Sequence, residues 1–175
     1  VTASQILWIN IVSDGFPNLA LTVEPKARDI MKKNPRDPNE KIVTTWMTRL
    51  IIAISLAGGI VSYLIFYFVY RNTSDVVLAQ SVTFASLGFN PLLYVFSVRT
   101  LEKPLWTQKL FSNKWLFLAV VLGAIFQVLP FMLPSLREFF GVVSIGYLWL
   151  VVLGEALFIV GIIELYKLLI HNRLK

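Results

Sequence analysis

Apolar stretches alternate with shorter polar segments along most of the chain. Five of these stretches contain about the 20 apolar residues that a helix needs to cross a membrane. They cover approximately residues 2–23, 46–70, 76–98, 115–133 and 142–169. The longer polar segments between them, residues 24–45 and 99–114, carry proline and several basic residues. The pattern predicts one all-α domain over residues 1–175, a polytopic membrane helix bundle with five transmembrane helices.

The first apolar stretch contains polar residues that a membrane helix seldom has. Asn10, Ser13 and Asp14 are spaced i, i+3 and i+4, so one helical face presents all three oxygen-bearing side chains. A carboxylate in lipid costs a few kcal/mol or more and marks a candidate functional site. Gly15 and Pro17 both weaken a helix, so we expect a break at residues 14–17 that frees backbone carbonyls. Oxygen ligands of this kind suit Ca²⁺ or Mg²⁺.

The composition agrees with a membrane protein. The chain is 57% hydrophobic and 15% charged, whereas soluble domains have roughly 25% charged residues. A net charge of +6 is compatible with nucleic-acid binding. The basic residues, however, cluster in short loops between apolar stretches, so the lipid bilayer is the expected partner and nucleic acid is not. The absence of cysteine excludes disulfides and thiolate metal sites.

The basic residues also predict an orientation. All of the 16 Lys and Arg residues except Arg71 and Arg137 fall on one side of the predicted helices. The excess of positive charge marks the cytoplasmic side. We therefore expect loops 24–45 and 99–114 and the C-terminus to be cytoplasmic, and the first helix to run from outside to inside.

The first forty residues resemble a known family. Their first part is similar to the sixth membrane helix of P-type cation-transporting ATPases, and most similar to the calcium-pump branch. The part after it resembles the cytosolic loop that follows this helix, and a weaker likeness continues to the last helix. The chain as a whole thus resembles helices six to ten, the C-terminal transmembrane region. The residues that carry the likeness are Leu7-Trp8-Ile9-Asn10-Ile11-Val12-Ser13-Asp14-Gly15-Phe16-Pro17, Ala20-Leu21, Glu24-Pro25, Asp29-Ile30-Met31 and Pro35-Arg36-Asp37-Pro38.

The resemblance implies the membrane portion of an ATP-driven pump, a translocase that alternates access to a mid-membrane site for Ca²⁺ or another hard cation. The chain has no GxxxxGK[ST] loop, and none of its aspartates begins an Asp-Lys-Thr-Gly phosphorylation motif. We therefore expect it to be a fragment without catalytic residues or a cofactor of its own. Mg-ATP would bind in the N-terminal remainder of the same polypeptide. That remainder would also supply the phosphorylation domain and the fourth and fifth membrane helices.

Asn90 and Pro91 place a polar kink in the third predicted helix, because proline frees a carbonyl about one turn upstream, near Ser86 and Leu87. In two-site calcium pumps the helix that this one resembles carries Glu three residues before the Asn. This sequence has Leu87 there. The first of the two calcium sites is therefore unsupported, and one cation per cycle fits the sequence better. Asn90 is a weaker candidate ligand than the residues of the first helix.

Glu155 is the second weaker candidate. It falls near the middle of the fifth predicted helix and has no cationic partner within reach on that helix. One interpretation is a protonated side chain that bonds Gln127 or a backbone carbonyl across a helix interface. The other is a counter-transported proton or an accessory cation site. The resemblance does not supply this residue, because the calcium pumps usually have an apolar residue at the position.

Other functions remain open at this level. Secondary transporters and channel subunits also place broken helices at a midplane site without ATP hydrolysis, and a purely structural scaffold needs no site at all. In the second helix, the pairs Ser55/Gly59 and Gly58/Ser62 predict close packing against a neighbour, either the absent fifth helix or a second copy of the chain. Glu164 and Lys167 are spaced i, i+3 and predict an ion pair.

Overall fold

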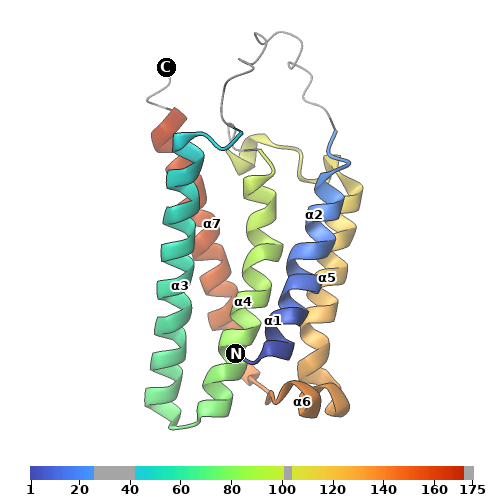
Figure 1. The fold of residues 1–175 in the computed structure, drawn as a ribbon, viewed down its shortest axis with the longest axis vertical. Helices are drawn as coiled ribbons and strands as arrows, with labels where there is room; N and C mark the ends of the chain where they lie inside the picture. Colours follow the sequence, from blue (N-terminus) through green and yellow to red (C-terminus); the bar gives the residue numbers. More distant parts are fainter. Residues whose placement is uncertain (26–41, 101–103, 172–175) are drawn as a thin grey trace.

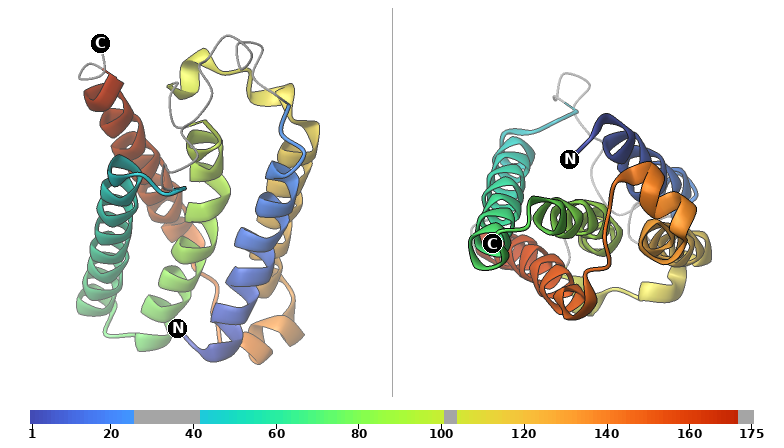
Figure 2. Two further views of the ribbon diagram at one scale, coloured as in Figure 1. Left: turned by 45° about the horizontal axis from the view of Figure 1, so that its top comes forward. Right: turned by 90° about the horizontal axis from the view of Figure 1, so that it is seen from below.

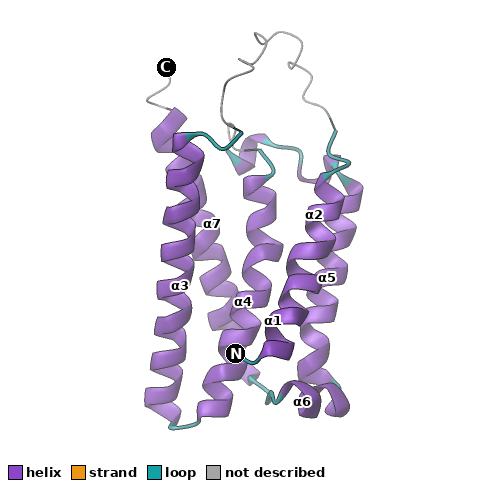
Figure 3. Cartoon of the chain, in the orientation of Figure 1, coloured by secondary structure: helices purple, strands orange, loops and turns teal. Residues whose placement is uncertain are grey.

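The computed structural model describes residues 1–25, 42–100 and 104–171, and its regular structure in these ranges is entirely helical (Figures 1 and 3). Four spans are long and apolar enough to cross a membrane. They are α3 (Thr45–Thr73), α4 (Val76–Val98), α5 (Lys114–Met132) and Gly146–Leu169, which lies within η5 (Gly146–Leu148) and α7 (Trp149–His171). The prediction of an all-α polytopic bundle is confirmed, with four such spans among the described residues where the sequence predicts five.

The first apolar stretch forms one continuous rod built from three short elements. These are α1 (Ala3–Ile9), the π-helical turn η1 (Asn10–Gly15) and α2 (Phe16–Leu21). The backbone stays in the right-handed helical region at both junctions, with φ −61° at Asn10 and −62° at Gly15. The predicted break at residues 14–17 is therefore wrong. A π turn, with its i→i+5 hydrogen bonds, adds a residue to the turn before Pro17 and relieves the proline without interrupting the helix.

Helix α4 lies at the centre of the described bundle. It contacts α3 and α7 on one side and α5, α1 and η1 on the other, as the end-on view in Figure 2 shows. In its most apolar window 56% of the residues are buried, compared with 17% for α3, whose outer face is open to lipid or to another helix. Asp75 caps the N-terminus of α4 by accepting a hydrogen bond from the Leu78 N–H at 2.9 Å. The side chains of α4 therefore decide how the other helices fit together.

Two glycines allow close approach between α4, α5 and η1. A Cβ atom at Gly88 of α4 would lie 2.1 Å from Nε2 of Gln127, the fully buried glutamine of α5. A Cβ atom at Gly123 of α5 would lie 2.6 Å from a methyl group of Leu92 and 3.2 Å from the backbone oxygen of Val12 in the π turn. A larger residue at either position would therefore collide with its neighbour, so both positions require glycine.

The region before the last spanning helix differs from the prediction. Residues 134–140, expected as part of a connection, form the short helix α6 (Pro134–Phe140), which Gly141 ends at φ +61°. The spanning helix then begins at Gly146, not at residue 142. Val142 and Ile145 are apolar because they are buried in the core beside Phe140, and this burial explains why hydropathy alone placed the start of the helix too early.

The ends of the helices separate the charges as the sequence predicts. The C-terminal ends of α2, α4 and α7 and the N-terminal ends of α3 and α5 lie at one end of the bundle, at the top in Figure 1. Arg71 ends α3 and Arg137 lies in α6, both at the opposite end. Residues 26–41, 101–103 and 172–175, which include most of loop 24–45, part of loop 99–114 and the C-terminal tail, lie outside the described residues.

Candidate cation site

The π turn η1 contains all three residues of the predicted site, Asn10, Ser13 and Asp14. Their environments differ. Asn10 is exposed, Asp14 is half-buried, and Ser13 is 1% exposed. Turns of π-helix are rare and occur frequently at functional sites. The structure thus keeps the three side chains within one turn, with Ser13 facing the bundle and Asn10 facing away from it.

Asp14 has no hydrogen bond or ion pair to any other described residue, and no arginine or lysine among them neutralises it. The phenol of Tyr94 on α4 lies close enough for electrostatic interaction with the carboxylate. The hydroxyl of Ser13 is buried without a hydrogen-bond partner in the described part of the chain. Within the described ranges, this turn thus offers a carboxylate and a hydroxyl without protein partners, which suit a cation.

The expectation that one helical face presents all three side chains is wrong, because Asn10 is exposed and Ser13 is buried, and the three offer too few oxygens to hold Ca²⁺ by themselves. Ca²⁺ takes about six to eight oxygen ligands. The described residues contain no group of three or more His, Cys, Asp or Glu side chains that could hold a metal ion. A complete site therefore needs oxygen atoms from elsewhere, and the exposure of Asn10 and the partial exposure of Asp14 leave that side of the turn open to them.

The structure places the two weaker candidates in a different cluster. Oε1 of Glu155 on α7 accepts hydrogen bonds from Oγ of Ser62 on α3 at 2.9 Å and from Nδ2 of Asn90 on α4 at 3.2 Å. All three side chains are buried. The predicted contact between Glu155 and Gln127 is wrong, because Nε2 of Gln127 donates to the carbonyl of Phe84 at 3.2 Å. Helix α5, which carries Gln127, packs against the face of α4 that contains Gly88.

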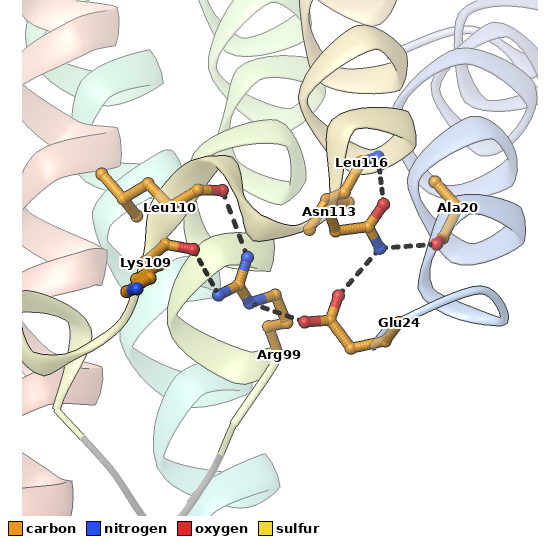
Figure 4. A network of polar contacts seen from close by, with 7 residues as sticks. All are labelled: Ala20, Glu24, Arg99, Lys109, Leu110, Asn113 and Leu116. Atoms are coloured by element: carbon orange, nitrogen blue, oxygen red, sulfur yellow. Dashed lines mark hydrogen bonds and ion pairs between the residues drawn. The ribbon is translucent and has the colours of Figure 1, made fainter. Parts of the chain in front are cut away.

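A polar network at the basic end of the bundle joins the end of the first rod to α4 and α5 (Figure 4). Nδ2 of Asn113 donates to the Ala20 carbonyl at 2.9 Å and to Glu24 at 2.8 Å, and its Oδ1 caps α5. Glu24 pairs with Arg99 at 3.3 Å. Arg99 also donates to two carbonyls of the following loop, those of Lys109 and Leu110. Sequence analysis missed this network; the only local signal was an Asn directly before an apolar stretch, the usual N-cap position.

The predicted ion pair between Glu164 and Lys167 is present at 2.7 Å. Both side chains are buried, and the second carboxylate oxygen of Glu164 accepts a hydrogen bond from the Leu105 N–H at 2.8 Å. By contrast, the small residues Gly58 and Gly59 of α3 have no side chain or neighbouring backbone within 4 Å of an added Cβ atom. Only Ser62, from the predicted pairs, is buried in the described bundle.

Comparison with known proteins agrees with this picture. The family model described as "Cation transporting ATPase, C-terminus" matches residues 1–169. A calcium-transporting ATPase of Bacillus subtilis is 32% identical over 153 residues, which are 86% of this chain and 17% of that protein. A calcium-transporting ATPase of Listeria monocytogenes is 32% identical over 168 residues, 95% of this chain and 19% of that protein. Calcium-transporting ATPase type 2C member 1 of Mus musculus is 32% identical over 166 residues, which are 93% of this chain and 17% of that protein.

Proposed function

Because this chain belongs to the family of cation-transporting ATPases, as a multi-pass membrane segment from their C-terminal region, we propose that it forms part of the transport pathway of an ATP-driven calcium pump. The chain spans between 17% and 19% of the length of the relatives named above. The remainder of such a pump would supply ATP hydrolysis and the phosphorylation step. This assignment replaces the alternatives of a secondary transporter and a structural scaffold.

The observation that carries the proposal is that Asp14, in a π turn of the first rod, has no hydrogen bond or ion pair to another residue in the part of the chain that the structure describes. In the proposed site Asp14 supplies negative charge, and Asn10 and Ser13 supply neutral oxygens. The remaining ligands would come from the fourth and fifth membrane helices of the pump. These helices would pack against the side of the rod that exposes Asn10 and against the open glycine face of α3.

Charge supports an orientation. Arg49, Arg99, Lys109, Lys114 and Lys167 lie toward the end of the bundle where α2 and α4 end, whereas Arg71 and Arg137 lie at the other end. By the excess of basic residues we assign the first end to the cytoplasm, together with the C-terminus. The side chain of Leu87, half-buried on α4, contains no oxygen, so one calcium ion per cycle is the expected stoichiometry.

The proposal is tested in the full-length pump by measuring calcium-dependent phosphorylation from ATP in the Asp14→Asn variant. Removing the charge at nearly constant shape should raise the calcium concentration needed for phosphorylation by at least tenfold. Asp75→Asn is the matched control, because it alters another aspartate of the chain but keeps a side chain able to cap α4. Unchanged calcium affinity in Asp14→Asn would show that the cation binds elsewhere.

A further inference from the structure

The cluster around Glu155 contains more oxygen atoms than its hydrogen-bond donors satisfy. Oε1 of Glu155 accepts two hydrogen bonds, from Ser62 and Asn90. Oε2 of Glu155, Oδ1 of Asn90 and Oγ of Ser86 are all buried and have no hydrogen-bond partner in the described residues. Ser86 precedes Asn90 by one turn on α4, so both side chains lie on the same stripe of that helix.

Each of these side chains is more than nine-tenths buried. Glu155 is 4% exposed, Asn90 7%, Ser62 5% and Ser86 is completely buried. Orphaned buried oxygens are costly, because a polar group out of water loses its hydration without a replacement. Three of them in facing helices, with a carboxyl group among them, indicate a place where positive charge is held.

No protein group in the described residues provides that charge. The ion pairs present there are Arg99 with Glu24 and Lys167 with Glu164, and Lys167 is three turns of α7 away from Glu155 by sequence. Both donors, Ser62 and Asn90, bond to Oε1 of Glu155, so Oε2 is left without a partner among the described residues. The site therefore offers one carboxyl group together with neutral oxygens from an amide and hydroxyls.

We propose that Glu155, Asn90 and Ser86 bind one monovalent metal cation, sodium or potassium, between α4 and α7. A single carboxylate matches a single positive charge, whereas a divalent ion would leave one uncompensated charge in a buried place. Carboxylate, amide and hydroxyl oxygens are the hard ligands that alkali cations accept. Ser62 acts differently: its hydroxyl donates to Oε1 and so holds the carboxylate in position.

This site is separate from the one proposed in the π turn. No hydrogen bond or ion pair among the described residues joins the two groups, and Glu155 lies on α7, which packs on the side of α4 opposite α5. The bound ion would tie α3, α4 and α7 into one unit. It would stabilise the bundle and need not travel with the transported cation.

The test measures thermal unfolding of the full-length protein in detergent at constant ionic strength, with choline chloride replaced stepwise by sodium or potassium chloride. A ligand that binds only the folded state raises the unfolding midpoint with its concentration. We expect the midpoint to rise with sodium or potassium, and the rise to disappear in Glu155→Gln. Glu138→Gln, which changes an exposed glutamate of α6, should retain the full response.

The outcomes separate the two proposals. If the unaltered protein shows no difference between choline and both alkali ions, the monovalent site does not exist, whatever the variants do. If Glu155→Gln is as stable as the unaltered protein and neither responds, the carboxyl group holds only a proton and the proposal is overturned. Asp14→Asn should keep the alkali response while losing calcium affinity. Loss of calcium affinity without any alkali response would therefore overturn only the inference about Glu155.

Discussion

Replacing Gly88 by alanine should destabilise the bundle strongly, although alanine is the better helix former. The added Cβ atom would lie 2.1 Å from Nε2, 2.2 Å from Cδ and 2.7 Å from Oε1 of Gln127. Real Cβ atoms essentially never come within 3.0 Å of a neighbour, so the amide of Gln127 must move. Gln127 is completely buried, and it therefore has no free space into which to rotate.

Two costs follow from this movement. Overpacking of a close-packed interior costs about 1–3 kcal/mol. Displacing the amide breaks its 3.2 Å hydrogen bond to the Phe84 carbonyl, and a buried amide without a partner costs about 1–3 kcal/mol more. The gain in helix propensity from glycine to alanine is at most about 1 kcal/mol. The net loss should therefore be about 1–5 kcal/mol in the free energy of unfolding.

The matched control is Gly161→Ala. Gly161 also lies inside a spanning helix, α7, but nothing is within 4 Å of its added Cβ atom in the described bundle. The assay is the fraction of monodisperse protein that survives heating in detergent, measured for the full-length chain with each variant. Gly88→Ala should unfold at clearly lower temperature than Gly161→Ala, and Gln127→Ala should relieve part of the defect in the double variant. Equal stability of the two glycine variants would refute the close approach of α4 and α5.

Further predictions concern two contacts between the first rod and α5, and the same heating assay checks both. Gly123→Ala should cost about 1–3 kcal/mol, because the new methyl group meets buried Leu92 and the backbone of the π turn. A Gly123→Ala variant as stable as Gly161→Ala would contradict this contact. Asn113→Ala should cost about 1–3 kcal/mol, since it removes the cap of α5 and the bonds to Ala20 and Glu24. Asn113→Ser, which keeps a capping hydroxyl but loses the amide donor, should be intermediate in stability between the unaltered protein and Asn113→Ala. A loss equal to that of Asn113→Ala would assign the whole effect to the lost donor.

Hydropathy predicts the approximate place of the four long spans because the requirement for apolar length is local. The first stretch, predicted as a fifth span, consists of three short helical elements. It does not predict the connections. Pro134 was interpreted as the end of a helix, whereas it begins α6 at a position that tolerates a residue without an N–H group. Val142 and Ile145 were assigned to the last span because buried loop residues and membrane residues are equally apolar.

The candidate site was located by one unusual local feature, charge within an apolar stretch. The backbone conformation of the site could not be predicted, because Gly15 and Pro17 are compatible with either a break or a π turn. Only packing against α4 and α5 selects between them. The partners of Glu155 were also out of reach. Ser62 and Asn90 come from two other helices, and only their relative rotation in the bundle brings them to the carboxylate.

The polar network of Asn113, Glu24 and Arg99 limits how the first rod can move. The end of the rod near Glu24 is tethered to the neighbouring helices by both main-chain and side-chain atoms. If the rod moves, it must either move together with α4 and α5 or deform in the π turn that contains Asp14. In the proposed pump this turn would be the part of the rod that deforms, and a small change of its helical pitch would alter the distances between the proposed ligands.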